Sequence, residues 1–141
     1  METKFESSVR EIPFPQQDVY DMLSDLSHLQ KVRDRVPDEK LNGLEFDSDT
    51  VSMKVDPVGL ISMRIVDREE PKCIKFETTN SPLPFNFWIQ MLPVTTTTSK
   101  MRLTIKADLN PFIKGMVSKP LKEALEKIAD AMAMMDYSKN D

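Results

Sequence analysis

The stretch NPFIKGMVSKPLKEALEKIADAMAMMDY, residues 110–137, has apolar side chains at the spacing of one long amphipathic helix. Asn110 is a favourable N-cap, and Pro111 suits the first helical position, where its missing N–H costs nothing. At ~1.5 Å per residue the helix would be about 40 Å long, enough to cross a small domain. Pro120 lacks a donor and its ring crowds the carbonyl of Met116, so we expect a kink or two joined helices there.

The segments before this helix alternate between apolar and polar residues, as strands with one buried face do. Strands are predicted at 4–12, 44–46, 50–55, 60–66, 73–79, 85–94 and 100–108, and short helices at 16–26 and 27–35. Strands joined by short turns pair antiparallel, since a parallel pair needs a crossover. We therefore expect one α+β domain, residues 1–141, in which a curved sheet of about seven strands wraps around the long C-terminal helix.

The composition is that of a globular domain, with 40% hydrophobic and 30% charged residues. A net charge of −4 argues against a nucleic-acid interface, which needs clustered Lys and Arg. The cluster Lys31-Val32-Arg33-Asp34-Arg35 is short and contains an acid, so we interpret it as a solvated surface. We see neither an apolar signal core nor the ~18–20 apolar residues of a membrane span, and we expect a cytoplasmic protein. The oligomeric state stays open.

The sequence offers few groups for catalysis or metal binding. Cys73 is the single cysteine, and its apolar strand pattern predicts a buried, inert thiol. His28 is the single histidine; an exposed or capping role is favoured over a general acid or base. One His and one Cys exclude a standard zinc site, and we see neither a calcium loop nor a glycine-rich phosphate loop. We therefore predict no catalytic residue, no metal and no cofactor.

A helix cannot follow a twisted sheet closely along its whole length, so large side chains fill the space between them or leave a cavity. Methionine suits both a filled core and a pocket for varied ligands, so both readings stay open. The residues expected to line this space are Met53, Ile61, Met63, Phe76, Phe87, Ile89, Met101, Met116, Leu121 and Ile128. Arg64 and Glu77 are predicted to point outward, but a bulge or register shift would make either a polar cavity group.

This element order resembles the START-like (SRPBCC, polyketide cyclase/dehydrase) helix-grip superfamily, which includes pollen-allergen and ubiquinone-binding proteins. The resemblance covers nearly the whole chain. It rests on the element order, on Asp56-Pro57-Val58-Gly59 between two strands, on Ile74-Lys75-Phe76-Glu77 and on the terminal amphipathic helix. The family has no universal catalytic signature, so no catalytic residue is carried over. The resemblance implies a cavity between sheet and helix that holds a hydrophobic small molecule such as a lipid, quinone, sterol or polyketide.

Three functions are compatible with these features. Non-catalytic binding or transport of an apolar ligand predicts an apolar cavity of roughly 300–1,000 Å³. A cyclase- or dehydratase-like enzyme needs at least two convergent ionisable side chains, which only Arg64, Glu77, Asp56 and His28 could supply. A protein-interaction module predicts a filled core and an exposed apolar patch near Trp88 or the segment 82–84. The shortage of inward-pointing ionisable residues favours binding over catalysis.

Overall fold

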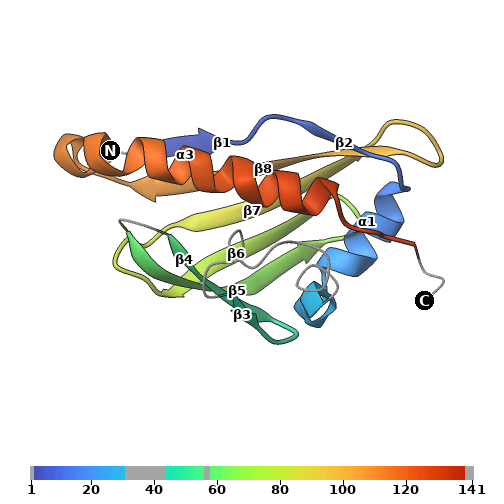
Figure 1. The fold of residues 1–141 in the computed structure, drawn as a ribbon, viewed down its shortest axis with the longest axis horizontal. Helices are drawn as coiled ribbons and strands as arrows, with labels where there is room; N and C mark the ends of the chain where they lie inside the picture. Colours follow the sequence, from blue (N-terminus) through green and yellow to red (C-terminus); the bar gives the residue numbers. More distant parts are fainter. Residues whose placement is uncertain (1, 31–43, 56–57, 139–141) are drawn as a thin grey trace.

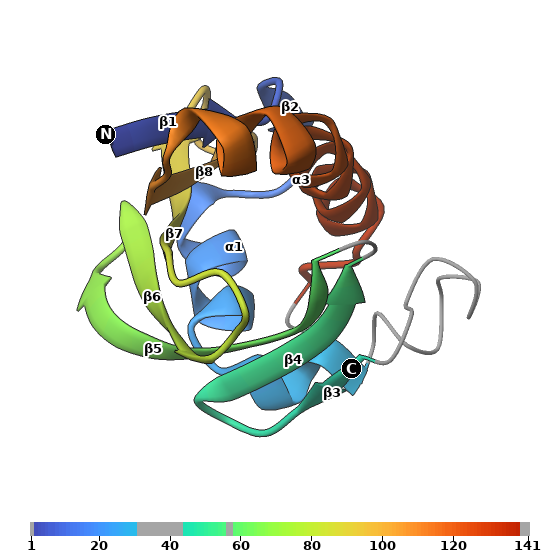
Figure 2. The same cartoon turned by 90° about the vertical axis from the view of Figure 1, so that its left-hand side faces the viewer.

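The computed structural model describes residues 2–30, 44–55 and 58–138, and there an antiparallel sheet curves around a long helix (Figures 1 and 2). The helices are α1 (Gln16–Leu23), the 3-10 helix η1 (Leu26–Leu29) and α3 (Pro111–Ala133). The strands are β1 (Glu2–Glu6), β2 (Arg10–Ile12), β3 (Glu45–Phe46), β4 (Thr50–Val55), β5 (Gly59–Glu69), β6 (Cys73–Asn80), β7 (Asn86–Pro93) and β8 (Ser99–Asp108). The strand order is β1-β8-β7-β6-β5-β4-β3, and β2 also pairs with β8. The predicted α+β helix-grip architecture is confirmed.

The predicted first strand, residues 4–12, is interrupted by a bulge. Glu6 lies opposite Thr104, and Arg10 lies opposite Met101. Arg10 follows Glu6 by four positions, whereas their partners on β8 are three positions apart, so this edge contains one extra residue. The extra residue reverses the side to which the following side chains point. Val9, predicted to point inward with the preceding alternation, is therefore 53% exposed. The sheet has eight strands instead of about seven because this edge is divided into β1 and β2.

Helix α3 begins as predicted but ends earlier. The Asn110 side chain accepts a hydrogen bond from the Ile113 backbone N–H at 2.9 Å, which confirms the N-cap. A kink or two joined helices was predicted at Pro120; the helix continues through this residue, so the prediction of two joined helices is wrong, and the kink stays a prediction. A single missing hydrogen bond is tolerated where the flanking turns are packed on the core. The helix ends at Ala133, and the buried Tyr137 belongs to the segment that follows it.

Polar contacts attach α3 to the edge formed by β1 and β2. The backbone N–H and hydroxyl of Ser8 donate to the Glu126 carboxylate at 2.7 and 2.6 Å. The Arg10 guanidinium donates to the Asp130 carboxylate at 2.9 Å, and Lys122 donates to the backbone carbonyl preceding the bulge. The bulged edge therefore carries partners for three successive turns of the helix.

The short helices close one end of the curved sheet (Figure 2). Five side chains of this region are buried: Val19, Tyr20, Met22, Leu23 and Leu26. The second predicted helix, 27–35, begins as η1, and its cap is Asp25, whose carboxylate accepts the Ser27 N–H at 3.0 Å. The rest of that helix, the basic cluster 31–35, Asp56 and Pro57 lie outside the described residues.

Candidate functional site

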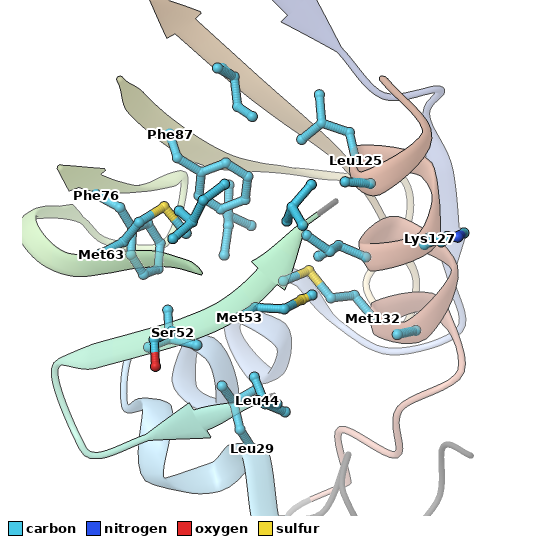
Figure 3. A pocket seen from close by; sticks show the side chains of 18 of the residues that line it. Leu29, Leu44, Ser52, Met53, Met63, Phe76, Phe87, Leu125, Lys127 and Met132 are labelled. Carbon is cyan, nitrogen blue, oxygen red and sulfur yellow. The ribbon is translucent and has the colours of Figure 1, made fainter. Parts of the chain in front are cut away.

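An apolar cavity lies between the concave face of the sheet and the C-terminal half of α3 (Figure 3). Its volume is about 130 Å³. Strands β4 to β8 form one wall because their alternate side chains point inward, and α3 forms the other. At the centre, the rings of Phe76 and Phe87 lie opposite each other on neighbouring strands and meet edge to face, with centroids 5.4 Å apart. This contact fixes two aromatic side chains in the floor of the cavity.

The structure brings eight of the ten predicted lining residues to this cavity: Met53, Ile61, Met63, Phe76, Phe87, Ile89, Leu121 and Ile128. Met101 does not line it. This residue is 1% exposed, on β8 opposite Arg10 of β2 and Met91 of β7, and it packs within the core. Met116 does not face the interior at all, because it is 52% exposed. Its neighbour Val117 takes the buried position, and consecutive helical residues point about 100° apart.

The candidate charged groups lie outside the cavity. Arg64 of β5 and Glu77 of β6 are directly opposite each other and both exposed, so neither is a polar cavity group. The pairing of β5 with β6 does shift twice, at Thr79 of β6 and at Val66 of β5, but Arg64 keeps its outward direction between these two positions. The His28 ring contacts the backbone carbonyl of Met22 through Nδ1 at 2.9 Å and is not among the lining residues.

Two polar residues line the cavity within the described part of the chain, Ser52 of β4 and Lys127 of α3. Lys127 is exposed, and Figure 3 shows its side-chain nitrogen directed away from the cavity. Within the ranges 2–30, 44–55 and 58–138, no three or more His, Cys, Asp or Glu side chains are grouped to hold a metal ion. The interior of this site offers apolar contact and shape rather than acid–base chemistry.

The remaining polar features belong to the outer face of the sheet. Trp88 lies there, with the ammonium groups of Lys75 and Lys106 each 5.5 Å from its ring centroid. A more open hollow of about 480 Å³ next to it is lined by Glu2, Glu77, Asn86, Lys106 and Asp108 among others. The stripe Asn86, Trp88 and Gln90 is therefore turned away from the cavity. Charges of both signs surround this hollow, so no single ligand charge is favoured.

Cys73 does not line the cavity, and its thiol is protected. Burial raises the pKa of the Cys73 thiol, and the nearby Glu69 and Asp67 carboxylates raise it further. A raised thiol pKa leaves little thiolate at neutral pH. Cys73 is half-buried at the start of β6, so the predicted full burial is too strong.

Sequence reasoning missed several lining residues because it assigned their elements to the core. Leu23, Leu26 and Leu29 of the short helices close one end of the cavity. On α3, Ala124, Lys127, Ala131 and Met132 complete the wall. Ala124 and Ala131 are separated by seven residues and share one side of the helix. Two small side chains on an otherwise large apolar stripe were a signal of open space beside the helix.

Comparison with known proteins agrees with this architecture. The family model described as polyketide cyclase / dehydrase and lipid transport matches residues 2–134. No curated protein sequence is similar enough to this chain to count as a match. Among the described residues, no helix combines the length and the apolar character needed to cross a membrane.

Solved structures with low sequence identity share the fold. One is norcoclaurine synthase from Thalictrum flavum in complex with dopamine and hydroxybenzaldehyde (TM-score 0.72, 14% identity, 94% of this chain and 85% of that chain covered). A second is the Zhui aromatase/cyclase from Streptomyces sp. R1128 (TM-score 0.68, 10% identity, 94% of this chain and 92% of that chain covered). A third is a START superfamily protein from Mycobacterium smegmatis (TM-score 0.65, 11% identity, 94% of this chain and 94% of that chain covered). From its family match and its helix-grip architecture, the chain belongs to the polyketide cyclase / dehydrase and lipid transport family.

Proposed function

We propose that this protein binds or transports a hydrophobic small molecule, lipid-, quinone- or polyketide-like, in the cavity between the sheet and α3, without catalysing a reaction. The observation that carries the proposal is the lining of the cavity, which is apolar apart from Ser52 and Lys127. Ligand sites of this kind gain affinity mainly from burying apolar surface, and a few polar groups set the orientation of the ligand.

The same lining argues against a cyclase- or dehydratase-like reaction. Proton transfer needs an acid and a base within hydrogen-bond reach of the reacting atoms. Lys127 is the one ionisable side chain among the described lining residues, and it points outward. Two similar folds are those of a synthase and an aromatase/cyclase, which shows that this scaffold can carry enzymes. The chemistry of such enzymes needs further groups inside the cavity.

The cavity is smaller than the expected range of roughly 300–1,000 Å³, because its own side chains occupy much of the space. Met53, Met63 and Met132 are among the residues that line it. Methionine has three rotatable bonds and repacks easily, so we expect these side chains to move when a ligand enters. An entirely filled core, as an interaction module requires, would instead keep them in place.

Two measurements test the proposal. The first is native mass spectrometry of the purified protein, with organic extraction of whatever is bound. A copurified apolar molecule supports the proposal. The second is titration with N-phenyl-1-naphthylamine, an uncharged fluorophore whose emission rises in apolar surroundings. Absence of both a bound molecule and fluorophore binding would contradict the proposal and favour an interaction module.

A cavity-filling variant identifies the binding place. Ala124→Leu adds a side chain at the cavity wall, and Ala133→Leu makes the same change on α3 away from the cavity. Displacing apolar surface of the fluorophore equivalent to about two methylene groups, at about 0.8 kcal/mol each, should weaken binding roughly tenfold in Ala124→Leu. Ala133→Leu should bind like the parent protein. Equal affinities for the two variants would exclude this cavity as the binding place.

A further inference from the structure

Lys127 is placed differently from the other charged residues of α3. Glu126, Asp130 and Lys122 are engaged in hydrogen bonds to the β1–β2 edge. Lys127 points about 100° away from Glu126 around the helix, and it takes part in the cavity lining. Its ammonium has neither a hydrogen bond nor an ion pair within the described part of the chain.

The surroundings of this ammonium favour a negative ligand group. The described residues that line the cavity include no carboxylate. On α3, the nearest turns carry Glu123, which is exposed, and Asp130, whose carboxylate is paired with the Arg10 guanidinium at 2.9 Å. Ala124 and Ala131, one turn before and one turn after Lys127, both line the cavity. The lysine stem therefore lies at the rim of the cavity, and its ammonium is directed outward (Figure 3).

We infer that the ligand is an amphiphile with one negatively charged headgroup, whose apolar body occupies the cavity and whose headgroup stays at the rim beside Lys127. This inference rests on the proposed binding function and adds the ligand class. An anion would remain hydrated at the rim, so its desolvation cost is small. The four-carbon lysine side chain is flexible and can turn its ammonium toward a headgroup emerging from the cavity. The short cavity suits one end of an alkyl chain or a compact apolar body.

The test compares decanoate with decanol, which share an alkyl chain and differ in headgroup charge. Each ligand displaces N-phenyl-1-naphthylamine from the parent protein, from Lys127→Gln and from Lys119→Gln, an exposed lysine of the same helix that does not line the cavity. An exposed ion pair is worth about 0.2–1 kcal/mol, so Lys127→Gln should weaken decanoate binding by a factor of about 1.4 to 5 and leave decanol binding unchanged. Lys119→Gln should bind both ligands like the parent protein.

Ionic strength gives an independent readout. Added salt should weaken decanoate binding to the parent protein more than to Lys127→Gln, because screening acts on the charge pair. Equal decanoate affinity in the parent protein and Lys127→Gln would overturn the inference while leaving the proposed function standing. If Lys119→Gln weakened decanoate binding as much as Lys127→Gln, the effect would come from surface charge in general, and this result would also overturn the inference. If neither decanoate nor decanol displaces the fluorophore, the proposed function fails as well.

Discussion

Tyr137 holds the segment after α3 against the core through one polar and one aromatic contact. Its hydroxyl donates to the Met132 carbonyl at 2.6 Å, and its ring meets Phe14 edge to face with centroids 5.8 Å apart. Tyr137→Phe keeps the ring and removes the donor, so it should lower the free energy of unfolding by about 1 kcal/mol in urea denaturation. Tyr20→Phe is the matched control, because Tyr20 is also a buried residue and no hydrogen bond of its hydroxyl is seen among the described residues. An equal loss of unfolding free energy in the two variants would show that the hydrogen bond to Met132 does not contribute to stability.

The same residue predicts how stability changes at alkaline pH. Burial raises the pKa of the Tyr137 phenol above its ordinary value of 10.0. The folded protein therefore keeps this proton where the unfolded chain has lost it, and the stabilisation is complete below pH 10.0 and declines as pH rises above it. Tyr137→Phe should show a shallower decline in urea midpoint above this pH. Part of the decline should remain, because burial also raises the pKa of Tyr20; an unchanged slope would contradict the assignment.

At the scale of elements, the bulge between β1 and β2 is an anchor for α3. Ser8→Ala removes the hydroxyl that donates to Glu126, and we expect a loss of about 1 kcal/mol in the free energy of unfolding. Val9→Ala alters the neighbouring exposed residue and should change stability by less than about 0.5 kcal/mol. A loss in Val9→Ala as large as in Ser8→Ala would point to the bulge backbone instead of the hydrogen bond.

The stability contributed by the Ser8–Glu126 hydrogen bonds should also depend on pH. Hydrogen bonds from the Ser8 hydroxyl and N–H hold the pKa of Glu126 below its ordinary value of 4.5. A lowered folded-state pKa contributes stability above pH 4.5 that is lost as pH falls through the folded-state pKa. The stability difference between the parent protein and Ser8→Ala should therefore shrink with acidification below that pH. A difference that stays constant would mean that Glu126 ionisation plays no part.

Prediction from sequence succeeds for these elements where the periodicity is unambiguous. Strand β8 alternates cleanly, and all four of its predicted inward residues are buried: Met101, Leu103, Ile105 and Ala107. The bulge after Glu6 could not be predicted, because an inserted residue is defined only by its partner strand. The error at Met116 has a similar origin. Met116 and Val117 are both apolar neighbours, only one can face the core, and the packing of the sheet decides which.

For the molecule as a whole, the attachment of α3 is unequal on its two sides. The β1–β2 side has the polar contacts of Ser8 and Arg10, whereas the side toward β4 borders the cavity. A bound ligand should therefore slow hydrogen exchange in β4 and in residues 124–132 and leave β1 and β2, which contribute no lining residue, unchanged. Ala124→Leu should reduce this protection at the same ligand concentration. Protection centred on β1 or β2 would contradict the binding place.

The residues of the cavity wall could largely be predicted from the sequence, but the volume of the cavity and its closed end could not. Alternation along the strands identified most of its wall, because those side chains must point to the concave face. Its volume and its closed end depend on how the leucines of α1 and η1 fold under the sheet, which sequence periodicity does not encode. The rim lysine was missed for the same reason, since Lys127 appears in the sequence as one of several charged residues on the polar side of a helix.

The place of Trp88 has a consequence for optical measurements. It is the single tryptophan of the chain, and it lies on the outer face between Lys75 and Lys106, on the opposite side of the sheet from the cavity. Its intrinsic emission should respond to unfolding and to the two lysines, and remain constant when an uncharged ligand enters. The indole therefore serves as a built-in reference signal for titrations with ligands, such as decanol, that do not absorb where the indole emits.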